Sequence, residues 1–190
     1  MKIILGSNSW HRKKILGDMG YEFEVMIPDV DERAIRHDDP ERLTLALAHA
    51  KADAILPRVS GDALVITADT VAVCDGKILE KPESAEEVRA FHRMYAEHPA
   101  RIVGAVVVAN TSTGARVEGT DCAAVHWRSV PESVIDTLIA EGSVFKYAGG
   151  FTLWEPLLQD YIAQIEGEPE SIVGLSPSLT RRLIGEMMSA

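Results

Sequence analysis

The chain has few cysteines, few aromatic residues and a shortage of basic charge. Its two cysteines, Cys74 and Cys122, are far apart and form no Cys-x-x-Cys pair, which excludes a disulfide framework and a cysteine-ligated zinc site. Lysine and arginine number 19 against 29 aspartates and glutamates, so the net charge is −10. Because nonspecific binding to nucleic acid requires a basic surface, we expect no nucleic-acid partner.

Long apolar runs are also missing. No run approaches the roughly 20 residues that a helix needs to cross a bilayer. Met1-Lys2 is followed by only three apolar residues before Gly6, which is too short for the apolar core of a signal peptide. These absences predict a cytoplasmic protein without a membrane partner.

Several well-known site motifs are absent as well. The sequence contains no Gly-x-x-x-x-Gly-Lys-Ser/Thr loop, no Gly-x-Gly-x-x-Gly fingerprint and no Gly-x-Ser-x-Gly elbow. Its six histidines form no i, i+4 metal pair within one predicted helix. The common nucleotide-binding, dinucleotide-binding and serine-hydrolase schemes therefore do not apply.

What remains is an ordinary globular composition, with 46% apolar and 25% charged residues. Periodicity predicts strands over 2–5, 21–27, 64–74, 101–110 and 115–127, and helices over 10–19, 41–56, 85–95, 131–141, 157–165 and 178–188. Local signals predict Ser9 and Ser84 as N-caps, Asp75-Gly76 as a hairpin turn, and Gly142 as the residue after a helix end. This order predicts an α/β fold with a mixed, twisted central sheet and flanking helices. We expect a single domain over residues 1–190 whose last third forms a second lobe, with a cleft between the two lobes.

The triplet Ala68-Asp69-Thr70 closes the apolar run Leu64-Val65-Ile66-Thr67, which has the length and β-branched content of a buried strand. Open α/β sheets place their chemistry at the carboxyl ends of strands. Asp69 is therefore a candidate site residue, provided that other charged side chains join it.

The first predicted turn and helix could grip phosphates. Gly6-Ser7-Asn8-Ser9 offers hydroxyls and the amides of a helix start, which bind anions. The run His11-Arg12-Lys13-Lys14 follows and is the densest basic run in this acidic chain. The alternative interpretation is a capped helix whose first turn is a solvated basic surface.

Two further charged segments have two interpretations each. Asp29-Val30-Asp31-Glu32 could hold a hard cation such as Mg²⁺ through carboxylate oxygens, or it could be a solvated acidic loop. Lys51 flanks the predicted apolar stripe of its helix, which consists of Leu43, Leu47, Ala50 and Ala54. The ammonium of Lys51 either extends to water or points into a site. Lys81, which Pro82 holds in an extended conformation, is likewise either an ordinary turn lysine or a site residue.

Seven short motifs, running nearly end to end, resemble those of the Maf family of nucleotide pyrophosphatases, in the same order. The motifs are Leu5-Gly6-Ser7-Asn8-Ser9-Trp10-His11-Arg12, Asp31-Glu32, Ala50-Lys51-Ala52, Ala68-Asp69-Thr70, Lys81-Pro82, Ala148-Gly149-Gly150, and Gly167 with Val173-Gly174-Leu175. The first is similar to the family's Leu-Ala-Ser-x-Ser-Pro-Arg-Arg, and Ala68-Asp69-Thr70 is similar to its central signature. The resemblance implies an inosine-triphosphatase-like fold.

The departures from the family pattern concern the nucleobase more than the phosphates. Trp10 and His11 stand where proline and the first arginine are usual, so a fixed guanidinium is replaced by a titratable imidazole. Trp154 or Glu155 occupies the position of a glutamine or glutamate associated with the base. The resemblance therefore supports the family's reaction for this chain more strongly than it supports any particular nucleobase in the substrate.

The resemblance implies metal-dependent hydrolysis of a modified or non-preferred nucleoside triphosphate to the monophosphate and pyrophosphate. Asp69 is expected to act as general base or to hold the metal-bound water, and Glu32 to be a metal ligand. The catalytic set is then Asp69, Lys51, Lys81 and Glu32, and the substrate-binding set is Ser7, Ser9, His11, Arg12, Thr70, Trp154 and Glu155. The implied metal is Mg²⁺, with Mn²⁺ or Co²⁺ as alternatives, and the implied assembly is a homodimer.

Three alternatives stay open. The protein could bind nucleotides without hydrolysing them, as a regulator of cell division. It could be a phosphatase that releases free phosphate, since Asp29-Val30-Asp31 after a strand faintly resembles an Asp-x-Asp phosphatase loop, although Arg33 does not fit that pattern. It could also be a structural or partner-binding domain.

Overall fold

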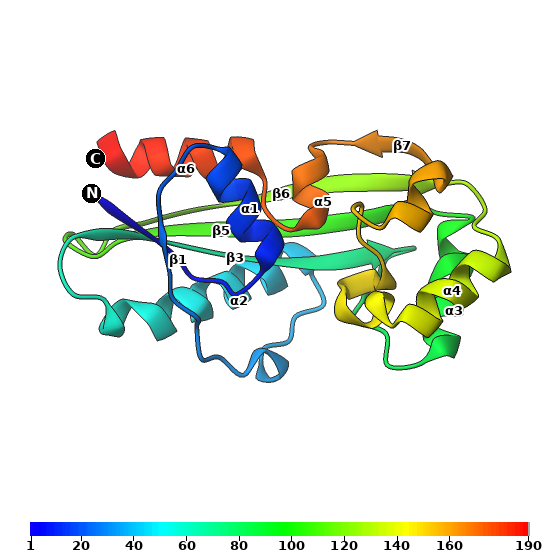
Figure 1. Ribbon diagram of the computed structural model, residues 1–190. Coiled ribbons are helices and arrows are strands. Elements are labelled where there is room, and N and C mark those ends of the chain that lie inside the picture. Colours follow the sequence, from blue (N-terminus) through cyan, green and yellow to red (C-terminus); the bar gives the residue numbers. More distant parts are fainter. Residues whose placement is uncertain (190) are drawn as a thin grey trace. The chain divides into compact units, whose positions relative to one another are not determined.

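A computed structural model describes residues 1–189 (Figure 1). The helices are α1 (Trp10–Asp18), α2 (Pro40–Ile55), α3 (Ala85–Tyr95), α4 (Glu132–Glu141), α5 (Pro169–Val173) and α6 (Pro177–Ser189). The strands are β1 (Lys2–Leu5), β2 (Glu24–Val25), β3 (Ala63–Cys74), β4 (Lys77–Leu79), β5 (Ala100–Asn110), β6 (Arg116–Trp127) and β7 (Ile162–Glu166). Short 3₁₀ segments are η1 (Glu32–Ala34), η2 (Leu56–Arg58), η3 (Ser143–Lys146), η4 (Ala148–Gly150) and η5 (Pro156–Tyr161). No helix within the described residues is long and apolar enough to span a membrane.

The strands form a mixed seven-stranded sheet in the order β2-β1-β3-β5-β6-β7, with β4 paired to β3. Strand β1 is parallel to both β2 and β3, whereas β3–β4 and β6–β7 are antiparallel. The predicted α/β fold with a mixed central sheet and flanking helices is thus confirmed, while the predicted cleft stays a prediction. The chain divides into two compact units whose boundaries fall within β3, β5 and β6 and at the end of α5.

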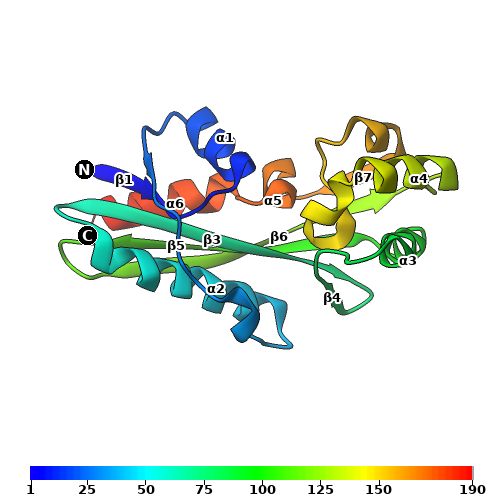
Figure 2. The same ribbon diagram turned by 60° about the horizontal axis from the view of Figure 1, so that its bottom comes forward.

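The first unit comprises residues 1–70, 104–121 and the chain from Gly174 onward. Helix α2 covers one face of its strands, and α1 and α6 cover the other (Figures 1 and 2). The core beneath α2 is aliphatic and small, and its buried members are Ile4, Ala48, Ala52, Ile55, Ala63, Val65, Ala105, Val107 and Ala109. Each large aliphatic side chain buried there contributes about 1.5–3 kcal/mol relative to exposure.

Gly6 packs closely against side chains of α2 and β3. A Cβ atom at Gly6 would lie 2.6 Å from Ile55 Cδ1 and 2.5 Å from Thr67 Cγ2, so these side chains would have to shift to admit a larger residue. Thr67 Oγ1 also donates a hydrogen bond of 2.8 Å to the carbonyl of Ala48 in α2. These contacts fix the position of α2 over β3.

The second unit comprises residues 71–103 and 122–173, and its core contains aromatic rings. Four rings form a series of edge-to-face contacts: His92 to Tyr95 at 5.9 Å, Tyr95 to Phe151 at 5.5 Å, and Phe151 to Trp127 at 5.2 Å between centroids. The buried Tyr95 hydroxyl donates to the carbonyl of Gly149 at 2.7 Å. Burial, with a smaller contribution from Cys74, raises the pKa of Tyr95, so the hydroxyl stays protonated as this donor.

Cap and turn residues in the sequence correctly predict where several of the helices and strands begin or end. Ser9 and Ser84 accept hydrogen bonds from the amides of Arg12 and Glu87 and so cap α1 and α3. Asp75-Gly76 forms the turn between β3 and β4, with φ of +49° and +71° at the two residues. These interactions lie within four residues of one another, which is why the sequence predicts them.

One predicted strand is too long, and one predicted helix is wrong. The predicted strand over 21–27 is reduced to Glu24–Val25, both exposed, because β2 ends the sheet and pairs with β1 alone. The predicted helix over 157–165 is η5 followed by β7. Its apolar spacing suits a helix, but Ile162 and Ile165 pair with Trp127 and Val125 of β6, a partner that local spacing does not reveal.

Candidate active site

Lys51 lies at the centre of a charged cluster in the first unit. Its Nζ atom is 2.9 Å from Glu32 Oε1 and also pairs with Asp69 Oδ1. The side chains of Lys51 and Asp69 are only 7% and 11% exposed, whereas that of Glu32 is 56% exposed. An ammonium buried among carboxylates is costly to desolvate, and its retention favours a functional role over a purely structural one.

The pleat of β3 and the period of α2 bring Lys51 and Asp69 together. Side chains alternate along a strand, so Val65, Thr67 and Asp69 share the face that α2 covers. On α2 the buried residues include Ala48, Lys51, Ala52 and Ile55. The predicted stripe through Ala50 and Ala54 is therefore wrong, since both are only partly buried and Lys51 faces the sheet.

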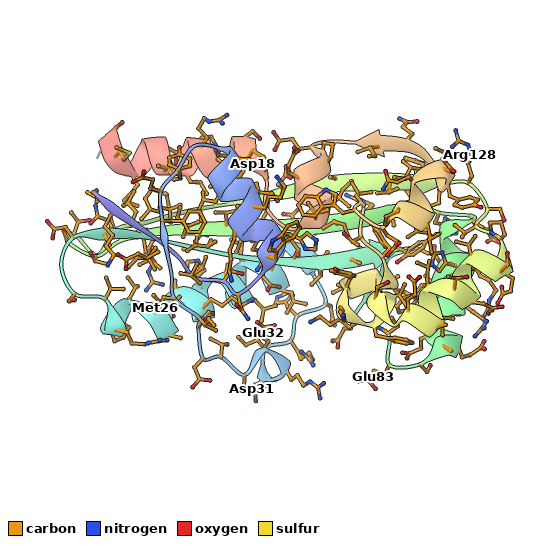
Figure 3. The ribbon with its side chains drawn as sticks, viewed as in Figure 1. Asp18, Met26, Asp31, Glu32, Glu83 and Arg128 are labelled. Carbon is orange, nitrogen blue, oxygen red and sulfur yellow. The ribbon has the colours of Figure 1, made fainter. Side chains whose placement is uncertain are left out.

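Glu32 lies in η1, the short segment between β2 and α2, next to Asp31 (Figure 3). Its carboxylate pairs with Lys51. The carboxylate of Asp31 accepts the backbone N–H of Arg33 at 3.2 Å and caps this turn. The capping interaction leaves Glu32 as the acidic side chain of this segment that joins the cluster.

Arg12 is the second buried cation of the first unit and is 8% exposed. Its Nε atom donates to the carbonyl of Gly174 at 2.9 Å, and its terminal nitrogens donate to Ser7 Oγ and Thr70 Oγ1, each at 3.4 Å. Burial lowers the pKa of the Arg12 guanidinium, while the nearby carboxylates of Asp69 and Glu32 oppose that shift. Arg12 remains protonated, because even a lowered arginine pKa lies far above neutrality.

The hydroxyls before α1 organise the helix start. Ser7 Oγ accepts the N–H of Ser9 at 3.1 Å, and Ser9 Oγ accepts that of Arg12 at 3.4 Å. Ser9 is therefore the N-cap of α1, and its role in substrate binding stays a prediction. Ser7, with its contact to Arg12, also belongs to the charged cluster.

His11 and Trp10 lie beside this cluster in sequence. Their rings meet edge to face with centroids 5.5 Å apart, and Trp10 is 63% exposed. Burial, and then the charge of Arg12, lower the pKa of His11, so both disfavour the imidazolium. The role of His11 in substrate binding stays a prediction.

Three predicted site residues belong to the second unit. Lys81 is exposed, and the carbonyl of the preceding Glu80 accepts the N–H of Gly149 at 3.0 Å. Glu155 accepts the N–H of Leu157 and the hydroxyl of Ser143, both at 3.3 Å, and so begins η5. Trp154 is 39% exposed. The roles of Lys81, Trp154 and Glu155 stay predictions.

The donors of the cluster fit a hard cation only in part. No group of three or more His, Cys, Asp and Glu side chains within the described residues could hold a metal. Glu32 and Asp69 nevertheless converge on a single cation, the Lys51 ammonium. Mg²⁺ typically takes one or two carboxylates and completes its shell with water and substrate phosphates, so two carboxylates suffice for a site that the substrate completes.

Gly174 is the site residue for which the sequence assigned no role. The motif Val173-Gly174-Leu175 is visible in the chain, yet Gly174 is 162 positions from Arg12, and only the structure reveals their hydrogen bond. The available signal in the sequence was the glycine itself. The structure explains why glycine suits this position, because φ at Gly174 is +129°.

Fold and site together define an α/β protein whose buried lysine and arginine suit a phosphate-bearing ligand. The Maf-like protein family matches residues 2–187, and the chain belongs to that family. A 7-methyl-GTP pyrophosphatase of Dictyostelium discoideum is 46% identical, over 97% of this chain and 96% of its own.

Other known proteins are similar to this chain at lower identity. A nucleoside triphosphate pyrophosphatase of Salinispora tropica is 34% identical, over 98% of this chain and 84% of its own. A nucleoside-triphosphatase/dITP/XTP pyrophosphatase from Mycobacterium abscessus has a solved structure that is 14% identical, with a TM-score of 0.43 over 69% of this chain and 75% of that one.

Proposed function

We propose that this protein is a nucleoside triphosphate pyrophosphatase that cleaves between the α- and β-phosphates and releases pyrophosphate. The observation that carries the proposal is the buried Lys51 held between Asp69 and Glu32, with the buried Arg12 nearby. Relatives that are 46% and 34% identical over nearly the whole chain are named as pyrophosphatases of this kind, which supports the proposal.

The chemistry requires a base and positive charge. Asp69, at the end of a buried strand segment, accepts the proton of the attacking water or holds that water in line with the scissile bond. Lys51 and Arg12 neutralise the phosphate oxygens, and the terminal nitrogens of Arg12 also donate to Ser7 and Thr70. Lys81 is proposed as a third phosphate-binding cation.

A divalent metal, Mg²⁺ or alternatively Mn²⁺ or Co²⁺, is proposed to be held by Glu32 and Asp69 and would supply further charge neutralisation when bound. Lys51 would then contact two kinds of group: the carboxylates, with which it already pairs, and the phosphates of the bound substrate. An ammonium suits this exchange, because its three donors rotate on a flexible stem.

We propose 7-methyl-GTP as the first substrate to test, because the relative that is 46% identical is named for it. A 7-methylated guanine carries a positive charge and therefore stacks favourably on an indole and pairs with a carboxylate. The chain offers the exposed indoles Trp10 and Trp154, and the carboxylate of Glu155, as candidates for this recognition.

The test is a panel of 7-methyl-GTP, GTP, UTP and dTTP with each of the three metals, assayed for both pyrophosphate and free phosphate. We expect pyrophosphate, fastest from 7-methyl-GTP and only with metal. Free phosphate as the product would identify a phosphatase instead. Saturable binding without any product would identify a nucleotide-binding regulator.

A homodimer in the cytoplasm is proposed from the family resemblance alone. Sedimentation at micromolar concentration tests the assembly, and a sedimentation coefficient of the monomer would contradict it. Fractionation of cells that express the chain tests the location.

A further inference from the structure

The position of the Arg12 guanidinium depends on one close contact. Its Nε–H donates to the Gly174 carbonyl at 2.9 Å, which is the usual length of such a bond, whereas the contacts with Ser7 and Thr70 are both 3.4 Å. The Gly174 carbonyl is therefore the principal restraint on the direction of this side chain.

The backbone at Gly174 makes that restraint possible. Its φ of +129° is a conformation that residues with a Cβ rarely adopt. A Cβ there would meet Arg12 Nε at 3.6 Å, an ordinary van der Waals distance, so space is not the obstacle. A larger residue is excluded because the backbone would rotate away from φ +129°, and the carbonyl would rotate with it.

A carbonyl holds the guanidinium without neutralising it. Within residues 1–189, Arg12 hydrogen-bonds only to neutral oxygens, and no carboxylate oxygen lies within ion-pair distance of it. A guanidinium has five N–H donors. Two of them, one on each terminal nitrogen, therefore remain without a partner in the described part of the chain. Two such donors match the two oxygens that a phosphate presents to arginine.

From these observations we infer that Gly174 is a positioning residue, whose carbonyl orients the Arg12 guanidinium so that its remaining donors meet the phosphates of the substrate. The inference rests on the proposed function and deepens it, because it assigns the loop before α6 to the phosphate-binding part of the site. Gly174 itself needs no contact with the substrate.

A double-mutant cycle tests this role. The four proteins are wild type, Gly174→Ala, Arg12→Lys and the double variant, and the measured quantity is kcat/KM for pyrophosphate release from 7-methyl-GTP. Arg12→Lys keeps the charge but loses the forked donors. We expect Gly174→Ala to lower kcat/KM by about 100-fold, the loss typical of a displaced binding group. In the Arg12→Lys background the same change is expected to have almost no further effect, because coupled residues are not additive.

Gly114→Ala is the matched control for backbone strain. Gly114 also has a positive φ, +72°, no atom lies within 4 Å of the Cβ it would gain, and it sits in the turn after β5, away from Arg12 in the sequence. Its kcat/KM is expected to match that of wild type. We also expect Gly174→Ala to divide its loss between kcat and KM as Arg12→Lys does, which a general loss of stability would not reproduce.

Three outcomes would overturn the inference. The first is a wild-type kcat/KM for a folded Gly174→Ala protein. The second is an equal loss from Gly174→Ala in the wild-type and Arg12→Lys backgrounds. If Gly174→Ala does not fold, exchange of the Arg12 Nε–H is measured by NMR in wild type and assigned by its loss in Arg12→Lys. Slow exchange supports the hydrogen bond, and rapid exchange is the third outcome.

Failure of the proposed function is distinguishable from failure of this inference. If wild type releases pyrophosphate from no nucleotide, the proposed function fails, and the cycle is repeated with the Kd for inorganic tripolyphosphate. A non-additive loss of tripolyphosphate affinity would still support the role of Gly174, whereas additive losses would contradict it.

Discussion

The two units of this protein bury different kinds of side chain. The first unit buries ions, namely Arg12, Lys51 and Asp69, and, among its described residues, the hydrophobic side chains that it buries include no aromatic ring. The second unit buries a series of aromatic rings around Tyr95 and Phe151, and His92 is its buried titratable side chain with a strongly lowered pKa. Buried ions are expensive unless paired, whereas buried aromatic rings stabilise a fold directly.

This difference indicates that the charged cluster of the first unit serves activity and the aromatic series of the second unit serves folding stability. Ion burial contributes little net stability and is therefore best explained by the chemistry that it makes possible. Aromatic burial needs no such explanation. Substitutions in the charged cluster should accordingly affect activity beyond their effect on folding, and substitutions in the aromatic series should affect folding first.

The largest expected effect is that of Asp69→Asn. The amide keeps the shape of the side chain but cannot accept a proton, so kcat for pyrophosphate release should fall by about 100- to 10,000-fold. Circular dichroism and urea unfolding should show a folded protein. Asp62→Asn, an exposed residue just before β3, is the matched control and should keep wild-type activity. Near-normal turnover in Asp69→Asn would remove Asp69 from the site.

Lys51→Met is expected to affect both stability and activity. It leaves the Asp69 carboxylate, 11% exposed, without its partner, and breaking such a buried pair costs about 3–5 kcal/mol. Urea unfolding measures this cost.

Two further variants separate the cost of the unpaired buried carboxylate from the cost of losing any lysine ion pair. Lys2→Met removes an exposed ion pair with Glu24 and should cost about 0–1 kcal/mol. The double variant Lys51→Met/Asp69→Asn should regain part of the lost stability but no activity. If the double variant regains activity, the charges of the first unit are structural only.

His92 should make stability depend on pH in the second unit. Burial, only partly opposed by Glu132, lowers the pKa of His92 to about 4 from an unfolded value of 6.5. Above pH 6.5 the imidazole is neutral in both states. Between pH 6.5 and about 4 the unfolded chain binds a proton that the folded chain does not, so stability falls with pH by about 3 kcal/mol in total.

The measurement is the free energy of unfolding of wild type and His92→Phe between pH 7 and 4. His92 Nε2 has no hydrogen-bond partner within the described residues, so phenylalanine loses no bond at that atom. The variant should match wild type near pH 7 and become the more stable protein as the pH falls. A constant difference across this range would contradict the prediction.

The smallest expected effect is that of Tyr95→Phe. The ring and its contacts remain, but the Gly149 carbonyl loses a hydrogen bond of 2.7 Å, which costs about 1 kcal/mol. Pyrophosphate release should be nearly unchanged. Tyr21→Phe, in the first unit, removes a hydroxyl with no hydrogen bond among the described residues and serves as the control for stability. A large loss of activity in Tyr95→Phe would show that the aromatic unit also sets the chemistry.

Much of the fold could be predicted because its signals are local. The caps Ser9 and Ser84, the Asp75-Gly76 turn and the αL residue Gly142 after α4 each act within one helical turn or hairpin. The prediction failed where the partner is distant. The segment Ile162–Glu166 became a strand only because β6 offered it hydrogen bonds.

The same distinction holds for the candidate site. Residue types alone made Arg12, Lys51 and Asp69 candidates, since charge in a strand end or beside an apolar stripe is unusual. Whether Lys51 extends to water or points inward depends on what lies over its helix face, and that is β3. Ser9 accepts the Arg12 N–H as the N-cap of α1, and its role as a phosphate ligand stays a prediction.

Amino-acid order therefore sufficed for the caps, turns, most elements and the kinds of charge available, because these depend on neighbours a few residues apart. The pairing of Lys51 with Asp69 across 18 residues, and of Arg12 with Gly174 across 162, required the assembled sheet. The physical reason is that the burial of a side chain depends on the distant segments that pack against it, and local sequence does not specify those segments. Burial is what turns three ordinary charged side chains into a candidate active site.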